Sequence, residues 1–128
     1  MCIRDRFRYA DADATAFGYA PGQVPGMPES FDAAGPLLSA AEHLAAEEGR
    51  QLWRGTMLSG GSFVTAENVG ATRELFPEAL STDMETTALA QVCGSHETPF
   101  LAVRSISDLC GPAADQPVSY THLTLPTM

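Results

Sequence analysis

The sequence STDMETTALAQVC, residues 81–93, changes its pattern at its centre. Up to Asp83 it continues a short strand-like segment, and after Glu85 it becomes an alanine-rich segment with helical spacing. The two acids flank Met84 at this junction, where the free N–H groups and the dipole of a helix start favour negative charge. Asp83 and Glu85 therefore either cap a helix or hold a ligand. Considered alone, capping is the simpler interpretation of Glu85.

The alternation of strand and helix patterns continues on both sides of this junction. Strands are predicted at 52–59, 78–82 and 99–108, and helices at 32–49, 65–76 and 84–93. Residues 9–31 hold several Gly and Pro with scattered aromatics, which is typical of a long ordered loop with a functional role. Alternating strands and helices predict an α/β fold with a largely parallel sheet.

Length, composition and charge limit the possible functions. A chain of 128 residues with 45 % apolar residues favours one domain with a packed core. The net charge of −9, with seven arginines and no lysine, disfavours binding to nucleic acid or to an anionic membrane, and favours a small neutral or cationic ligand. No apolar run approaches the ~20 residues that span a bilayer. Three cysteines without paired spacing favour a reducing, cytoplasmic location, and the sequence calls for no metal or cofactor.

The two ends of the chain share one possible DNA origin. The codons ATG TGT ATA AGA GAC encode Met1 to Asp5, and their reverse complement, GTC TCT TAT ACA CAT, encodes Val118 to His122. This oligonucleotide resembles the mosaic end of a transposase sequencing adapter, and LTLPT after it resembles the same adapter read onward. We therefore expect residues 1–6 and 118–128 to be adapter-derived, which leaves residues 7–117 as the authentic segment.

Three predicted strand ends carry unusual residues. They are SGGSFV at 59–64, the trio at 83–85, and RSISD at 104–108. Ligands of open α/β sheets bind beyond the carboxyl ends of the strands, and parallel strands bring these ends to one edge. Each group also has a structural explanation: a glycine turn with Phe63 in the core, a helix cap, and an Arg104–Asp108 pair. Their convergence nevertheless favours a binding site.

One chemistry fits this combination of side chains. An aromatic face stacks on a base, one carboxylate binds a vicinal diol, and a second carboxylic acid protonates a leaving group. These are the groups needed to cleave the N-glycosidic bond of a nucleoside, because a protonated base leaves more easily while the sugar becomes oxocarbenium-like.

Four motifs in this order resemble one family of enzymes. DADATAFGYAPGQVPGMP, SGGSFV, STDMETTALAQVC and PFLAVRSISD resemble the methylthioadenosine/S-adenosylhomocysteine nucleosidases of the purine nucleoside phosphorylase-like superfamily. The resemblance covers nearly all of 7–117, roughly the second half of that family's chain. It implies a partial three-layer α/β sandwich with a central, mostly parallel, twisted sheet whose N-terminal half is missing.

The resemblance also implies roles for single residues in catalysis. Asp108 matches the general acid that protonates adenine at N7, and Ser107 matches a residue that assists it. Arg104 matches the arginine near the attacking water. These three residues are the expected catalytic group.

Further matches concern the nucleoside itself. Phe63 matches the ring stacked on adenine, and Val64 the residue whose backbone bonds the base edge. Glu85 matches the acid that binds the ribose hydroxyls, Met84 lines the sugar, and Asp83 supports the turn with a weak contact of its own.

The long loop matches a segment that reaches a neighbouring subunit. Phe17, Tyr19 and Pro25 match residues lent to the partner's alkylthio pocket, which implies a homodimer of the full-length parent. The expected reaction is hydrolysis of methylthioadenosine and S-adenosylhomocysteine with release of adenine.

The chain departs from the family in two respects. Gly61 stands where many members have an aspartate, and the half that carries the water-activating glutamate and a loop over the ribose is absent, as is the closing C-terminal helix. We therefore expect the 128-residue chain itself to be inactive and poorly folded. A nucleoside phosphorylase, a futalosine-type hydrolase of the same superfamily, and a non-catalytic nucleoside-binding remnant stay open as alternatives.

Overall fold

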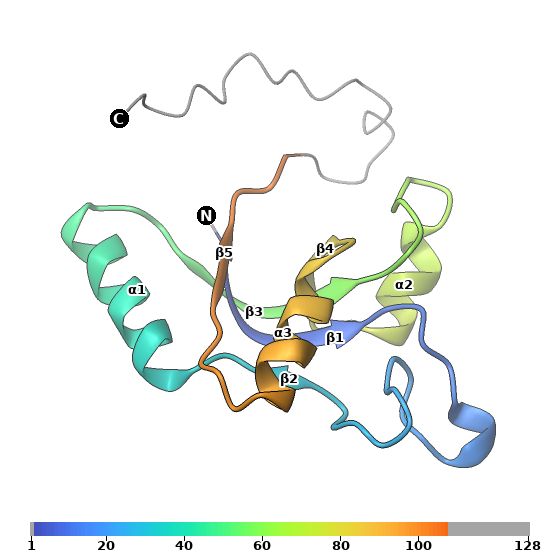
Figure 1. Cartoon of the computed structure of the whole chain (residues 1–128). Helices are drawn as coiled ribbons and strands as arrows, with labels where there is room; N and C mark the ends of the chain where they lie inside the picture. The colour runs from blue at the N-terminus through green and yellow to red at the C-terminus, as the bar shows by residue number, and fades with distance from the viewer. Residues whose placement is uncertain (1, 108–128) are drawn as a thin grey trace.

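The computed structural model describes residues 2–107 and contains one mixed sheet with three α-helices (Figure 1). The strands are β1 (Cys2–Tyr9), β2 (Phe31–Asp32), β3 (Trp53–Ser59), β4 (Ala79–Asp83) and β5 (Ala102–Arg104). The helices are α1 (Gly35–Glu47), α2 (Val69–Leu75) and α3 (Thr86–Ser95), with one 3₁₀ turn at Thr15–Phe17. The α/β fold with alternating strands and helices is therefore confirmed.

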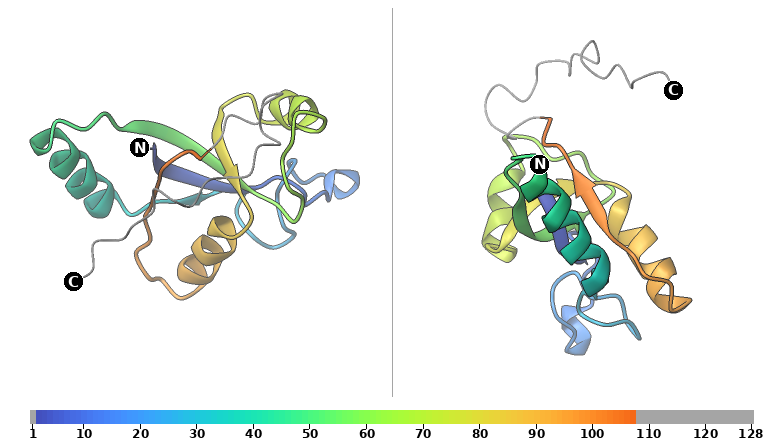
Figure 2. Two further views of the ribbon diagram at one scale, coloured as in Figure 1. Left: turned by 90° about the horizontal axis from the view of Figure 1, so that it is seen from above. Right: turned by 90° about the vertical axis from the view of Figure 1, so that its left-hand side faces the viewer.

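The three longest strands run parallel in the order β1, β3, β4. The short strands β2 and β5 both pair with β1 in the antiparallel direction. Two views in Figure 2 place α3 and α2 on opposite sides of the sheet, which gives a helix–sheet–helix arrangement. The sheet is thus mixed but mostly parallel in its longer strands.

A small core lies between the sheet and α3. Phe7, Met57 and Ala90 are fully or almost fully buried and contact one another. The ring of Phe100 meets Phe7 edge to face, with ring centroids 5.1 Å apart. The side of α3 that carries Leu89 and Val92 is instead exposed, by 57 % and 59 %. The core therefore joins three elements, while the predicted apolar face of α3 is only partly used.

The strands β1 and β2 were not predicted from the sequence, because residues 1–6 were set aside and residues 9–31 were predicted to be a loop. Residues 2–6 were set aside as adapter-derived, but they form five of the eight residues of β1, and Ile3 is completely buried. Leaving them out of the fold prediction therefore removed the strand with which β2, β3 and β5 all pair. The adapter origin of these residues is a statement about the DNA and stays a prediction, as do the boundaries 7–117 and 118–128.

Helix boundaries follow from local sequence. Pro36 lies in the first turn of α1, where its missing N–H costs nothing, and Gly49 follows the helix with a φ of 64°. Among residues 2–107, none of the helices has both the length and the apolar character that a bilayer crossing requires.

Candidate functional site

Asp83 is the hydrogen-bonding centre of the junction between β4 and α3. Its Oδ1 accepts hydrogen bonds from Ser59 Oγ at 2.6 Å and from the backbone N–H groups of Glu85 and Thr86 at 3.2 and 3.1 Å. Its Oδ2 accepts one from the Thr86 hydroxyl and one from Arg104 Nη1, the latter at 3.0 Å. A single carboxylate therefore ties the end of β3, the start of α3 and the end of β5 together.

The environment of Asp83 keeps this carboxylate ionised at neutral pH. Partial burial by itself raises the pKa of Asp83, but hydrogen bonds from Ser59, from Thr86 and from the backbone of Glu85 together outweigh that effect and leave the pKa below its ordinary value. The Asp83 side chain is only 9 % exposed, so the bonds are shielded from water. The ionised carboxylate also pairs with the guanidinium of Arg104.

Glu85 does not cap α3 with its side chain. It occupies the N-cap position, but its carboxylate makes no cap hydrogen bond, and Asp83 bonds the first N–H groups instead. The Glu85 carboxylate is exposed and has no hydrogen bond to any other residue within 2–107. The capping interpretation of Glu85 is therefore wrong, and the structure leaves this carboxylate available to a ligand.

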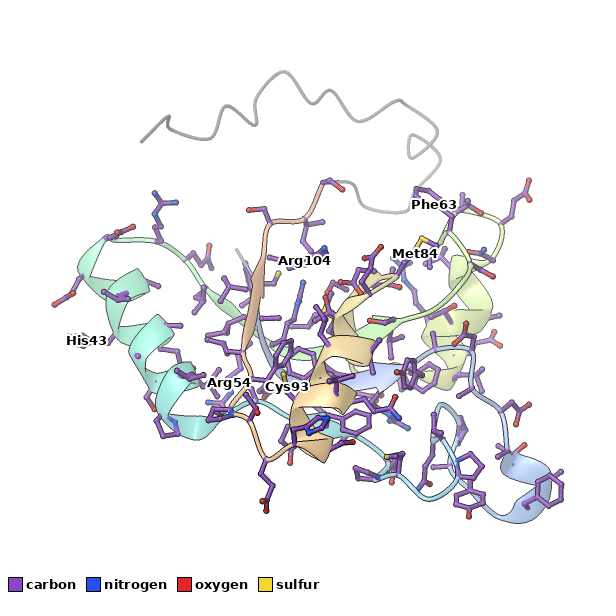
Figure 3. The ribbon with its side chains drawn as sticks, viewed as in Figure 1. His43, Arg54, Phe63, Met84, Cys93 and Arg104 are labelled. Carbon is purple, nitrogen blue, oxygen red and sulfur yellow. The ribbon has the colours of Figure 1, made fainter. Side chains whose placement is uncertain are left out.

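Phe63 lies in a fixed turn with its ring exposed. The turn is held by the Gly60 N–H, which bonds the Asp83 carbonyl at 3.1 Å, and by the Gly61 N–H, which bonds the Asp11 carboxylate at 2.7 Å. The ring of Phe63 is 64 % exposed, so its interpretation as a core residue is wrong. Figure 3 shows Phe63 and Met84 at the same end of the molecule.

Arg104 reaches the site by a route that the sequence did not predict. Its strand β5 runs antiparallel to β1, with Arg104 opposite Cys2, so the expectation that parallel strands bring all three strand ends to one edge is wrong for β5. The Arg104 side chain nevertheless extends to Asp83, with which it pairs, while the expected Arg104–Asp108 pair stays a prediction. Asp108 lies outside the described residues, so its predicted role is untested.

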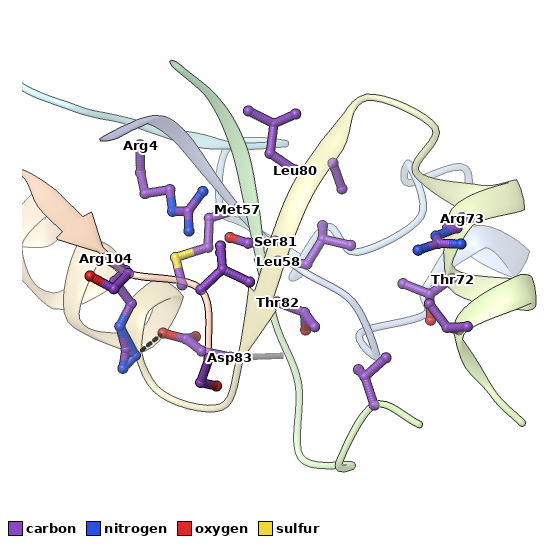
Figure 4. A pocket seen from close by; sticks show the side chains of 16 residues that line it. Arg4, Met57, Leu58, Thr72, Arg73, Leu80, Ser81, Thr82, Asp83 and Arg104 are labelled. Carbon is purple, nitrogen blue, oxygen red and sulfur yellow. Dashed lines mark hydrogen bonds and ion pairs between the residues drawn. The ribbon is translucent and has the colours of Figure 1, made fainter. Parts of the chain in front are cut away.

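A cavity of about 470 Å³ opens beside the Asp83–Arg104 pair (Figure 4). This volume lies in the range of small-molecule sites. Its lining includes four of the predicted site residues, namely Val64, Asp83, Arg104 and Ser107. The predicted ligand-binding residues Phe63, Met84 and Glu85 are not part of that lining. The structure thus brings one part of the predicted site together around a cavity and leaves the other part exposed nearby in the chain.

The loop residues expected to reach a neighbouring subunit are at the surface. Phe17 is 83 % exposed, Pro25 is exposed and Tyr19 is half-buried. The loop itself is anchored by Arg8, whose Nη2 donates to the Pro21 carbonyl at 2.9 Å. The three residues therefore lie on an anchored loop, and their predicted contact with a neighbouring subunit stays a prediction.

Two residues near the site were missed in the sequence analysis. Ser59 of β3 lies opposite Asp83 of β4 and donates a hydrogen bond to it. The polar residues that end the two strand patterns, LSG and STD, could have indicated this pairing. Arg4 is completely buried and lines the cavity, but it belongs to the segment that was set aside. The sequence pattern alone could not show that this part of β1 lines the cavity.

The fold and this site are those of an α/β protein with a small-molecule cavity beside the ends of parallel strands. The model of the phosphorylase superfamily matches residues 1–125, and the chain belongs to this superfamily. The structure is also similar to solved 5'-methylthioadenosine/S-adenosylhomocysteine nucleosidases.

Three of these solved structures illustrate the similarity. The enzyme from Neisseria meningitidis, in complex with methylthio-immucillin-A, is 41 % identical with a TM-score of 0.84, over 89 % of this chain and 50 % of its own. That from Colwellia psychrerythraea, in complex with adenine, is 34 % identical with a TM-score of 0.82, over 89 % and 48 %. That from S. pneumoniae, with a transition-state inhibitor, is 32 % identical with a TM-score of 0.82, over 88 % and 50 %. The present chain spans about half the length of each.

Proposed function

We propose that this chain is part of a nucleosidase that hydrolyses the N-glycosidic bond of 5'-methylthioadenosine and S-adenosylhomocysteine and releases adenine. The observation that carries the proposal is the difference between the two acids at the start of α3, one of which is hydrogen-bonded within the protein while the other is exposed. Asp83 uses both carboxylate oxygens within the protein, whereas the Glu85 carboxylate is exposed and unbonded among residues 2–107. The similarity to solved nucleosidases that hold adenine or an inhibitor supports the same substrate class.

In this proposal the free groups bind the nucleoside. Phe63 stacks on adenine, and the backbone of Val64 bonds the edge of the base. Glu85 accepts hydrogen bonds from the ribose hydroxyls, while Met84 lines the sugar. Asp83 keeps Glu85 in place through the backbone N–H that it binds.

The bond cleavage itself needs a proton donor at the base. Asp108 gives its proton to N7 of adenine, with Ser107 assisting, so that the base leaves as the sugar becomes oxocarbenium-like. Arg104 lies near the attacking water. We expect the residue that activates this water to lie in the half of the solved nucleosidases that this chain does not match, so we expect the 128-residue chain by itself to be inactive.

The decisive variant is Asp108→Asn in the full-length parent. Loss of the proton donor is expected to lower kcat by about 10² to 10⁴-fold at neutral pH, as measured by adenine release. Asp108→Asn is compared with Asp83→Glu, which keeps a carboxylate in the structural position. A loss below tenfold for Asp108→Asn would exclude its role as the acid, and adenine release by the 128-residue chain would contradict the expected inactivity.

Phosphorolysis is a second candidate, because the part of the cavity lining that lies within residues 7–117 holds two arginines, Arg73 and Arg104, against the single acid Asp83. The two reactions differ in their need for phosphate. Adenine release that occurs at the same rate without phosphate supports hydrolysis. A strict requirement for phosphate, with the sugar released as its 1-phosphate ester, supports phosphorolysis.

A further inference from the structure

The side chain of Asn68 bonds the backbone on both sides of Val64. Its Nδ2 donates a hydrogen bond to the Phe63 carbonyl at 2.9 Å, and its Oδ1 accepts one from the Thr65 N–H at 2.8 Å. The two bonds need a donor and an acceptor on one short side chain, which a carboxamide supplies. Asn68 therefore holds both peptide groups that flank Val64.

The planarity of the peptide bond passes this constraint on to Val64 itself. In a trans peptide the C=O and the N–H point in opposite directions, and the peptide bonds within residues 2–107 are trans. The Phe63 carbonyl and the Thr65 N–H both point at the Asn68 side chain. The N–H and the C=O of Val64 consequently both point away from Asn68, so that one residue presents a donor and an acceptor on the same side.

Both of these Val64 groups lack a hydrogen-bond partner in the part of the chain that the structure describes. Val64 is half-buried and lines the cavity beside Asp83. Backbone groups away from water are almost always paired, so the Val64 donor and acceptor are available to a ligand. Adenine offers the matching pair on one edge, because its amino group lies beside a ring nitrogen that accepts.

The Asn68 carboxamide is not used to cap the helix that follows it. Asn68 occupies the N-cap position of α2 but makes no side-chain cap hydrogen bond. Its backbone fixes its place instead, because its N–H donates to the Thr65 carbonyl at 3.3 Å and its own carbonyl accepts from Thr72 Oγ1 at 3.4 Å. The side chain is thereby placed to act on the turn rather than on α2.

We propose that Asn68 is a positioning residue of the base site, which holds the Val64 N–H and C=O in the orientation in which they bond the base edge. The inference rests on the proposed function, since that function makes Val64 the residue that bonds adenine. A turn that is ordered before binding gives higher affinity than a mobile one, because the cost of ordering is met during folding. Asn68 acts on the base only through Val64.

Asn68→Asp separates this role from helix capping. Asp and Asn are about equally favourable at an N-cap, so the variant keeps the cap preference and an acceptor for the Thr65 N–H. It cannot donate to the Phe63 carbonyl, and at neutral pH it places a negative charge beside that oxygen. Asn68→Ala removes both bonds. Glu67→Ala is the matched control, because Glu67 is the exposed neighbour whose side chain makes no hydrogen bond or ion pair within residues 2–107.

The test is the calorimetric binding of adenine to the full-length parent. The Kd of adenine should rise about tenfold in Asn68→Asp and in Asn68→Ala and stay unchanged in Glu67→Ala. The KM for methylthioadenosine should rise by a similar factor while kcat falls less than about threefold, because Val64 bonds the base in the ground state and in the transition state alike. The thermal unfolding midpoint of Asn68→Asp should stay within about 2 °C of the unaltered parent, since the cap preference is kept.

Two results would overturn the inference. One is a Kd in Asn68→Asp within about twofold of the unaltered value, and the other is an equal rise in Glu67→Ala. A parent that binds adenine but releases none from the nucleosides refutes the proposed hydrolysis and leaves the comparison of the Asn68 variants valid. A parent that binds no adenine overturns both.

Discussion

Replacing Asp83 by Asn tests whether one carboxylate joins the strands to α3. The amide keeps an oxygen for Ser59 and for the backbone N–H groups, but its NH2 group now faces Thr86 and the guanidinium of Arg104. A hydrogen bond to a charged group contributes about 1.5 kcal/mol or more, while the half-exposed Arg104 pair contributes less than about 1 kcal/mol after screening. The expected loss in the free energy of unfolding is therefore about 2 kcal/mol at pH 7.

Glu85→Gln is the matched control for this substitution. It makes the same chemical change two residues away, at an exposed carboxylate without a hydrogen bond to the described residues, so it should alter stability by less than about 0.5 kcal/mol. Urea unfolding, followed by the fluorescence of the single Trp53 and by circular dichroism in a stabilising osmolyte, measures both. With a typical urea dependence, Asp83→Asn should move the midpoint by about 1 M. Midpoints of the two variants that agree within about 0.2 M would refute the reasoning.

The same comparison has a defined pH dependence. Because the pKa of Asp83 is lower in the folded chain than its ordinary value, its contribution to stability is fully present above the unfolded pKa of about 3.9. The contribution is lost as the pH falls through the lower, folded pKa. The stability difference between the unaltered chain and Asp83→Asn should therefore stay constant from neutral pH to about pH 5 and then shrink on further acidification. A difference that grows toward acid pH would contradict this assignment.

Two further variants test how the long loop is held. Gly22→Ala should lower the free energy of unfolding, measured in urea, by at least about 1 kcal/mol more than Gly18→Ala. Both glycines have positive φ, but only at Gly22 would a Cβ lie 2.1 Å from the Tyr9 carbonyl oxygen. Equal losses in the two variants would show that the backbone moves enough to remove this clash. Arg8→Met removes the donor that holds Pro21 and should speed proteolytic cleavage within 10–30 severalfold, with unchanged cleavage rates speaking against the anchor.

The spacing of apolar residues correctly predicted those strands and helices whose bounds are set by local sequence. The strands β3 and β4 and the helix α1 lie close to their predicted bounds, because alternating residues and a first-turn Pro36 act locally. The direction of β5 could not be predicted in this way. The sequence of a three-residue strand does not indicate which strand it pairs with. The antiparallel pairing of β5 with β1 depends on contacts about 100 residues apart in the chain.

The candidate site was predictable to a similar extent. The strand-to-helix junction indicated that Asp83 and Glu85 matter, but only the register of Ser59 opposite Asp83 shows which acid is structural and which is free. The burial of Arg4 could not be predicted, because arginine is rarely buried completely and the pattern of a charged segment gives no reason to expect it. The motifs pointed to both acids, and the hydrogen bonds show that Asp83 is bonded within the protein.

The position of β4 has a consequence for handling this chain at high concentration. Within residues 2–107, β4 pairs with β3 on one side only, so its other side presents backbone donors and acceptors as a template for aggregation. Its interior, Ala79 to Thr82, is uncharged, and the acids Glu78 and Asp83 act as gatekeepers at its two ends. High protein concentration therefore favours intermolecular strand pairing along this side of β4 and insoluble material, whereas dilution reduces both.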